Sequence, residues 1–582
     1  MSPPFRVPQT QRPGVRLGLL WNMTQLETLP FKRGEPAATA GLRASLKAPD
    51  MRKRRRDLLD RFDREGDPDV QLEAAFLEYM VHDFDAGLAT AKAAYRGLRQ
   101  QGRKRRAALA AAAVGRIYFE GLNNQVAARG WFARGRTMLA DEGECVERGW
   151  VELGLVGCSV TDVGALATKA AEAVKLARKF DDLDLECKAL ADQGLALVTL
   201  GRDAEGMELI DEAMAILNSG EVHSFAAGQV ACCTLTACER IGDLARADAW
   251  LRVLDEVGIS PSDQQTPILF AHCQATYGSL LCQVGRWGEA ETALTLSLTA
   301  GRNGFFLHRV MSRASLADLR VRQGRHREAE QLLAACGDRW EAIPTRAKLH
   351  YVRGEFEHAV SSVKQALRQI GEDHVRAVPL MALLANAEIA RGDADAARRA
   401  AESADRLARE TRSPMLIGEA ALAMANVLSA AGKVGPAAAA LEAGLRAVES
   451  IEQVLIKGAL HLALARLLAD SDSPVAVIEA RAALAIYERL DAPEAEVCAT
   501  LLRRLGAKVS YSRRPPADPL APLSRREREI VQLIGQGLTN AQISEKLFIT
   551  PKTAEHHVSN ILGKLALRSR YEVAAITTAI RT

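Results

Sequence analysis

A short segment near the C-terminus carries side chains that could read a DNA duplex. Five of its polar residues recur at spacings of three and four, which places them on one face of a helix. They are Lys552, Glu555, His556, Ser559 and Asn560. Side chains of these types on the N-terminal half of an exposed helix reach base edges and phosphates in the major groove. The alternative is an ordinary solvated face, which is what most charged helix faces are.

The residues before this segment predict a first helix. Ser524 and Glu527 have the spacing of a capping box, in which each side chain bonds the backbone of the other. An apolar run follows from Ile530 to Ile534, and Gly537 stands just past it, where a left-handed residue ends a helix. The pattern therefore predicts a helix between Ser524 and Gly537.

Two further caps predict a second helix and the helix that carries the polar face. Thr539 and Gln542 form another capping box. Thr550 can cap a third helix with Pro551 at its first position, where a missing N–H costs nothing. The third helix is predicted to run to about Leu565, and its apolar stripe is Ala554, Val558, Ile561, Leu562 and Leu565. Three caps this close together indicate a helix-turn-helix (HTH) unit.

This segment resembles the LuxR/FixJ type of HTH domain found in response regulators. The matching positions are Leu523, Ser524, Arg526, Glu527, Glu529, Gly537, Asn540, Ile543, Ile549, Thr550, Thr553, His557, Lys564, Leu565 and Arg570. The resemblance covers about a tenth of the chain, and its motif is long and specific. Ala554 departs from the valine usual in the family, which reduces core volume without abolishing the fold.

The resemblance implies a set of DNA contacts. Base contacts fall on Glu555, His556 and Ser559, and backbone contacts on Asn540, Lys552 and Thr553; Asn560 and Lys564 complete the predicted DNA-binding residues. Many relatives have a basic residue where Glu555 stands. A glutamate repels phosphate but accepts from cytosine N4, so an unusual operator sequence is expected.

The resemblance also implies roles outside the base-reading face. His557 is expected to be structural, and a last helix from about residue 569 to 578 is expected to mediate dimerisation on inverted half-sites. A homodimer on double-stranded DNA is the implied form. RNA polymerase is a further candidate partner.

The composition of the whole chain favours close-packed helices. Of 582 residues 48% are hydrophobic and only 5% are aromatic, and the length leaves room for several domains. No run of eighteen apolar residues and no secretory signal core is present, so we expect a cytoplasmic protein without a membrane span. The ten cysteines have no metal-ligand spacing. Most are expected to be small buried hydrophobes, and a redox switch among Cys232, Cys233 and Cys238 is the alternative.

Charge is spread unevenly along the chain. Residues 1–56 carry a formal net charge of +9 and residues 506–582 of +6, whereas the segment between them carries −11. An acidic body is repelled by phosphates, so this distribution fits a protein whose C-terminal part alone contacts nucleic acid.

The middle of the chain is predicted to be a helical-repeat array. A turn signature, in which glycine is followed a few positions later by alanine, recurs about every forty residues. Its glycines are Gly201, Gly242, Gly285, Gly324, Gly354, Gly392 and Gly432, and the alanines include Ala247, Ala290, Ala329, Ala359, Ala397 and Ala437. Weaker copies lie near His82, Asn123, Val160 and Ser473. This period with small residues between helices is typical of an α-solenoid, and it resembles tetratricopeptide repeats (TPR) with lengthened helices.

These patterns predict an all-α chain in four parts: a long TPR-like α-solenoid followed by a small four-helix LuxR-type HTH domain, with an arm before and a linker between. The basic arm, residues 1–56, is expected to be mostly disordered, and translation from Met51 is an alternative. The repeat array spans residues 57–505, a Pro- and Arg-rich linker residues 506–522, and the HTH domain residues 523–582.

Three classes of function are considered: an enzyme, a DNA-binding regulator and a scaffold. The chain has no G-x-x-x-x-G-K-[S/T] phosphate loop, no acidic receiver segment and no nucleophile–base set, so we expect neither catalysis nor a cofactor. A sequence-specific DNA-binding transcriptional regulator is favoured, with an array that binds a protein, peptide or small-molecule effector. The alternative is a non-catalytic TPR-type scaffold that uses its HTH for protein contacts.

Overall fold

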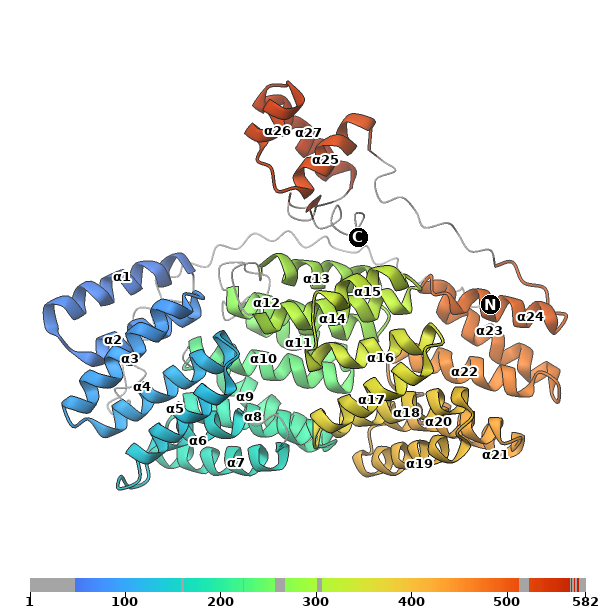
Figure 1. Cartoon of the computed structure of the whole chain (residues 1–582), viewed down its shortest axis with the longest axis horizontal. Helices are drawn as coiled ribbons and strands as arrows, with labels where there is room; N and C mark the ends of the chain where they lie inside the picture. The colour runs from blue at the N-terminus through green and yellow to red at the C-terminus, as the bar shows by residue number, and fades with distance from the viewer. Residues whose placement is uncertain are drawn as a thin grey trace, which may run out of the picture.

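The computed structural model describes residues 48–158, 162–222, 224–256, 267–300, 306–511 and 523–565, together with Leu567, Arg570, Val573 and Ala574. Within these residues the chain forms helices and no strand, which confirms the predicted all-α class (Figure 1). No helix in this part of the chain is both long and apolar enough to cross a membrane.

The helices of the array are α1 (Ala48–Glu65), α2 (Pro68–Met80), α3 (Phe84–Gln100), α4 (Lys104–Arg116), η2 (Ile117–Gly121), α5 (Gln125–Met138), α6 (Val146–Gly157), α7 (Val163–Phe180), α8 (Leu183–Thr199), α9 (Asp203–Asn218), α10 (Ser224–Ile241), α11 (Leu244–Glu256), α12 (Pro267–Gln283), α13 (Trp287–Ala300), α14 (Phe306–Arg322), α15 (His326–Ala334), η4 (Trp340–Ala342), α16 (Ile343–Val352), α17 (Phe356–Ile370), α18 (His374–Arg391), α19 (Ala394–Thr411), α20 (Pro414–Ala430), α21 (Val434–Ala447), α22 (Val454–Leu468), α23 (Ser473–Arg489) and α24 (Glu494–Arg504). The C-terminal helices are α25 (Arg525–Gly535), α26 (Asn540–Leu547) and α27 (Pro551–Lys564).

The repeating turn signature has the geometry that its residues predict. All seven turn glycines adopt positive φ, between 73° and 83°, a region that costs other residues free energy. The six partner alanines are fully buried, because they lie where the helices of a pair touch. His82 and Asn123, in two of the weaker copies, also have positive φ. The copy near Val160 lies outside the described residues.

The array winds so that segments far apart in the sequence lie against each other. Nε2 of Gln453 donates to the carbonyl of Gly242 at 3.1 Å, across 211 residues of sequence. Nδ1 of His374, at the start of α18, pairs with the carbonyl of Leu200 at 3.1 Å. Such contacts go beyond the neighbour-to-neighbour packing of a simple repeat stack.

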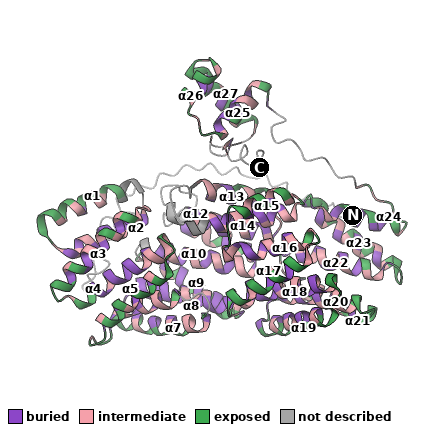
Figure 2. Ribbon diagram, in the orientation of Figure 1, coloured by how far each residue is buried: buried purple, intermediate pink, exposed green. Residues whose placement is uncertain are grey.

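Hydrophobic burial follows the same winding. One core cluster contains residues from Leu153 to Leu319 and also residues from Leu462 to Leu502, so the two ends of that stretch share a core. Buried residues follow the contacts between helices, and exposed residues cover the outward surface (Figure 2). Helices α25–α27 have a separate core of their own.

Described residues reach into two of the predicted flanking segments. Helix α1 begins at Ala48, within the arm predicted to be mostly disordered, and Nε of Arg55 in its basic run bonds Oε1 of buried Glu78 in α2 at 2.8 Å. Residues 1–47 lie outside the described part. After α24 the first residues of the predicted linker do not stand free, because Val509 and Tyr511 pack against the core of the array. The rest of that linker lies outside the described residues.

The close approach of the windings predicts unequal costs at two turn glycines. A methyl group at Gly201 would overlap the side chain of Thr411, whereas one at Gly354 would meet no atom within 4 Å, and both glycines have φ of +79°. Alanine at either site costs roughly 1–2 kcal/mol of backbone strain, and Gly201→Ala adds about 1–3 kcal/mol of overpacking. We expect Gly201→Ala to lower the Tm clearly more than Gly354→Ala, measured by circular dichroism. Equal losses would mean that the windings do not support each other.

Candidate functional site

The first helix of the C-terminal unit is capped as predicted. The backbone N–H of Glu527 donates to Oγ of Ser524 at 3.3 Å, and the backbone N–H of Ser524 donates to Oε2 of Glu527 at 2.8 Å. Two backbone donors at the start of α25 are satisfied in this way. Gly537 follows the helix with φ of +84°.

The second and third helices also begin where the sequence predicts. Thr539 and Gln542 form the second capping box, ahead of α26. The hydroxyl of Thr550 accepts from the N–H of Thr553 at 3.1 Å, with Pro551 at the first position of α27. These interactions fix the direction in which α27 leaves the turn.

A small apolar core holds α27 against the other two helices. Its buried members are Leu523, Ile530, Val531, Leu533, Ile534, Ile543, Ala554, Val558, Ile561 and Val573. Ala554 is fully buried there, so the small side chain is accommodated where relatives carry valine. Burial of this stripe leaves the opposite face of α27 exposed.

The exposed face contains most of the predicted DNA-binding residues. Lys552, Thr553, Glu555, His556, Ser559 and Asn560 are all exposed on α27. His557 is half-buried, as a structural residue would be. The structure therefore brings six of the eight predicted residues together on one helix surface.

The other two predicted residues are held by contacts within the domain. Asn540, the first residue of α26, accepts from Nη1 of Arg570 through its Oδ1 at 3.2 Å. Nζ of Lys564 donates to both carboxylate oxygens of Glu527, at 2.8 and 2.7 Å. DNA contacts by these two residues stay predictions.

The Lys564–Glu527 pair joins the end of α27 to the start of α25. Hydrogen bonds from Lys564 and from the backbone of Ser524 lower the pKa of the buried Glu527 to about 2. Glu527 thus serves two helices at once, as a cap and as the partner of a cation. The cap is predictable from the sequence, whereas the ion pair is not, because Lys564 lies 37 positions from Glu527.

Two further features of the unit were not singled out from the sequence. Nη2 of Arg526 donates to the carbonyl of Leu547 at 2.7 Å, and Arg570 bonds the carbonyl of Leu538, so both arginines secure the turns. Phe548 stands in the turn before α27 with φ of +55° and is 97% exposed. Of the predicted last helix only Arg570, Val573 and Ala574 are described, so its role in dimerisation is untested.

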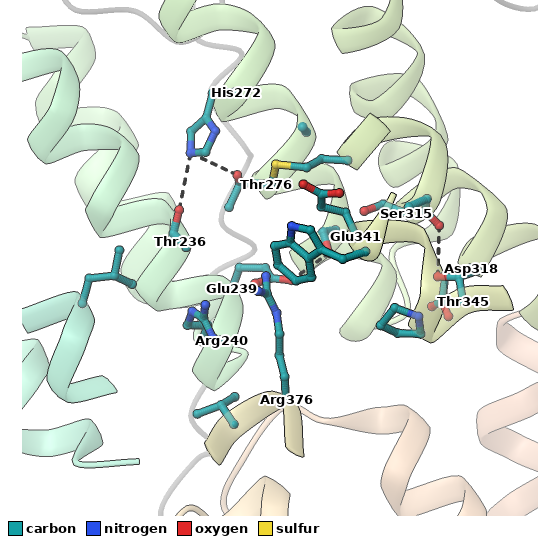
Figure 3. Close-up of a pocket in the computed structure, with 18 of the residues that line it drawn as sticks. Thr236, Glu239, Arg240, His272, Thr276, Ser315, Asp318, Glu341, Thr345 and Arg376 are labelled. Carbon is teal, nitrogen blue, oxygen red and sulfur yellow. Dashed lines mark hydrogen bonds between the residues drawn. The ribbon is translucent and has the colours of Figure 1, made fainter. Parts of the chain in front are cut away.

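The array contains a second candidate site, a partly open cavity of about 1660 Å³ (Figure 3). Helices from α2 to α24 contribute to its lining. Charged groups are paired across its wall: Asp318 accepts from Arg322 and from Lys348, each at 2.7 Å. Burial alone would raise the pKa of Asp318, but the two cations outweigh it and hold the pKa below its usual value. The cavity itself was not predicted from the sequence, because its walls come from distant segments; Cys232 and Cys233 of its lining were singled out only as candidate redox thiols.

The cysteines are free thiols in buried surroundings. None of the ten is in a disulfide, and only Cys232 and Cys233 are more than slightly exposed. Burial raises the pKa of Cys238 to about 12 and also raises that of Cys233. The reactive thiolate form is therefore disfavoured, which weighs against the redox alternative.

The capped helices and the exposed face of α27 define a helix-turn-helix domain. Residues 521–577 match the family described as bacterial regulatory proteins, luxR family. This segment is a LuxR-type HTH domain, as the sequence motifs predict.

Curated relatives share this segment. The DNA-binding transcriptional activator DevR/DosR of Mycobacterium tuberculosis is 38% identical over 64 residues, which is 11% of this chain and 30% of that protein. The transcriptional regulatory protein LnrK of Bacillus subtilis is 49% identical over 57 residues, 10% of this chain and 26% of that protein. The oxygen regulatory protein NreC of Staphylococcus aureus is 47% identical over an equal length, 10% of this chain and 26% of that protein. The chain thus spans less than a third of each of these relatives.

Solved structures resemble the chain more distantly. The APC/C hetero-tetramer Cut9-Hcn1 has a TM-score of 0.45 at 13% identity, covering 79% of this chain and 96% of that one. A Rap protein complexed with competence and sporulation factor has a TM-score of 0.37 at 14% identity, covering 55% of this chain and 97% of that one. With TM-scores and identities this low, neither similarity is evidence about the ligands or partners of this chain.

The pair between Lys564 and Glu527 predicts an acid-sensitive domain. A lowered carboxylate pKa stabilises the fold above the unfolded-state value of about 4.3, and that contribution is lost as the pH falls toward 2. We expect Lys564→Met to lower the Tm of a fragment spanning residues 506–582 at pH 7 and to flatten its loss of stability between pH 5 and 2. Circular dichroism melts at several pH values measure both effects.

Lys552→Met is the matched control, because Lys552 is an exposed lysine on the same helix with no ion pair among the described residues. It should leave the pH dependence unchanged. If both variants behaved alike, the pair would contribute nothing measurable to the fold.

Proposed function

We propose that this chain is a sequence-specific DNA-binding transcriptional regulator whose helical array acts as the sensor of an effector. The observation that carries the proposal is the exposed polar face of α27 within a LuxR-type domain. The array then spans about residues 48–511, which extends the predicted range at both ends, and the DNA-binding domain spans residues 523–582.

In this proposal α27 enters the major groove as the recognition helix. Lys552, in the first turn, contacts phosphate, whereas His556 and Ser559 reach base edges one and two turns further along the helix. Glu555 contacts a cytosine N4 donor. None of the described contacts occupies the side chains of Lys552, Glu555 or His556, so they are available to a duplex.

The proposal also includes macromolecular partners. A homodimer on DNA through the C-terminal helix is proposed, because two HTH units read two half-sites more tightly than one. Contact with RNA polymerase and a cytoplasmic location belong to the proposal as well. The chain is proposed to act without catalysis or a cofactor.

The concave cavity supports the sensor role of the array. A partly open space of about 1660 Å³ with charged and apolar walls is the kind of site that binds an effector. In this proposal the array has two arrangements that differ in their affinity for the effector. Effector binding favours one of them and thereby changes how the DNA-binding domains pair.

Salt dependence tests the DNA-binding role. The full chain and the fragment of residues 506–582 should both bind duplex DNA, and more weakly as salt rises, because phosphate contacts release counterions. Fluorescence anisotropy with labelled duplexes measures this. Absence of duplex binding at low salt would favour the scaffold alternative.

Single substitutions on α27 distinguish residues that contact phosphate from residues that contact bases. Lys552→Ala should weaken binding to all sequences about equally, whereas His556→Ala should change the preferred sequence in a binding-site selection. Lys433→Ala is the control, since Lys433 is an exposed lysine of the array. An unchanged preferred operator for His556→Ala would remove this histidine from the base-reading set.

A further inference from the structure

Three segments that are distant in the sequence meet at one wall of the concave cavity. Their charged residues and one tryptophan form what we name the junction cluster: Glu239 and Arg240 of α10, Trp340 and Glu341 of η4, and Asp373 and Arg376 at the start of α18. Figure 3 shows Glu239, Arg240, Glu341 and Arg376 gathered there. The cluster brings opposite charges together on a wall where the side chain of Asp373 is 7% exposed and that of Arg376 is 36% exposed.

Two guanidinium groups of the cluster share one carboxylate. Nη1 of Arg240 donates to both oxygens of Asp373 at 2.8 Å, whereas Nη1 of Arg376 lies 3.5 Å from Oδ2 of the same residue. The guanidinium of Arg376 lies 5.3 Å from the centre of the Trp340 ring. Arg376 is thus held in place by stacking while its hydrogen-bond donors are poorly matched by protein.

The environment of these arginines leaves room for a second anion. Burial and the neighbouring charge of Arg240 lower the pKa of Arg376. The side chain of Arg240 is only 10% exposed, yet its Nε has no hydrogen-bond partner among the described residues. A buried donor without a partner costs free energy, which an incoming carboxylate would recover.

The same wall offers acceptors for a cation. Glu341 is 8% exposed on its side chain, and its Oε2 has no hydrogen-bond partner in the described part of the chain. Its Oε1 accepts from Arg339 at a long 3.3 Å. Glu239 accepts from Ser279 and Gln283, which are neutral, so its charge is not matched by a contacting cation there.

Size and charge together restrict what the cavity can hold. Its volume of about 1660 Å³ exceeds the roughly 300–1,000 Å³ that drug-sized molecules occupy. The lining also carries the carboxylates Glu239, Glu341 and Glu419, so an anionic ligand that lacks a cationic group is disfavoured there. Apolar surfaces from Phe119 and Trp150 line the same space and suit hydrophobic side chains.

We propose that the cavity binds a short peptide, with its free C-terminal carboxylate on Arg376 and Arg240 and a cationic group of the peptide on Glu341. This assignment rests on the proposed sensor role of the array and names the chemistry of its effector. The planar forks of two arginines suit a carboxylate, and a peptide is the ligand that supplies a carboxylate, an ammonium or guanidinium group and apolar side chains in one chain.

Affinity selection with defined mixtures tests the proposal. The immobilised full chain is offered random hexapeptides with free C-termini, the same mixture with amidated C-termini, or the free amino acids, and retained molecules are identified by mass spectrometry. We expect enrichment of particular free-acid peptides and a loss of about tenfold or more on amidation, the size expected for charged hydrogen bonds. No enrichment, equal retention of amidated peptides, or retention of single amino acids would overturn the proposal.

Substitutions locate the peptide within the cavity. Arg376→Gln should reduce retention of the selected peptides as amidation does, Arg376→Lys should restore it in part, and Glu341→Gln should select peptides that differ in their cationic positions. Arg398→Gln is the control, because Arg398 is exposed on α19 and does not line the cavity. Circular dichroism melts confirm that each variant folds. Unchanged peptide retention by folded Arg376→Gln would refute the assigned contact.

Duplex binding measured on the same preparation keeps the two proposals apart. A chain that binds DNA but enriches no peptide would refute the peptide assignment and leave the regulator function standing. A chain that enriches peptides but never binds duplex DNA would refute the regulator function instead.

Discussion

A buried ion pair between Arg240 and Asp373 joins helices α10 and α18, which lie 133 residues apart in the sequence. Burial alone would raise the pKa of Asp373, but the charges of Arg240 and Arg376 outweigh it and keep the pKa below its usual value. Removing one partner of such a pair leaves an uncompensated buried charge and costs about 3–5 kcal/mol. The pair therefore holds together two parts of the winding that a simple repeat stack would leave apart, and Arg240 also lines the cavity.

The features that could be predicted from the sequence are the local ones. The capping boxes at Ser524 and Thr539 and the positive φ of the turn glycines need only residues within a few positions, so spacing predicts them. The junction cluster needs three distant segments, and no local pattern encodes their meeting. Likewise, no local pattern shows that Arg55, at the end of the predicted arm, contacts Glu78 of another helix.

The array and the LuxR-type domain have separate cores. Leu523 and the apolar residues of α25–α27 form a core that shares no member with the cluster running from Leu153 to Leu502. A domain with its own core keeps its geometry when the array changes, so an effector would alter where the DNA-binding domain is held more than how α27 is shaped. The exposed face of α27 supports this view, because its shape depends on contacts inside the small core alone.

Helix α24 connects the cavity wall to the segment that precedes the DNA-binding domain. Glu494, the first residue of α24, lines the cavity, and burial raises its pKa. At the other end of the same helix Nη2 of Arg503 donates to the carbonyl of Tyr511 at 3.2 Å, and Val509 packs on the array core. The segment that leads to the DNA-binding domain is thus attached to a helix that also forms part of the cavity wall. A displacement of α24 at the cavity would therefore also move the residues that begin this segment.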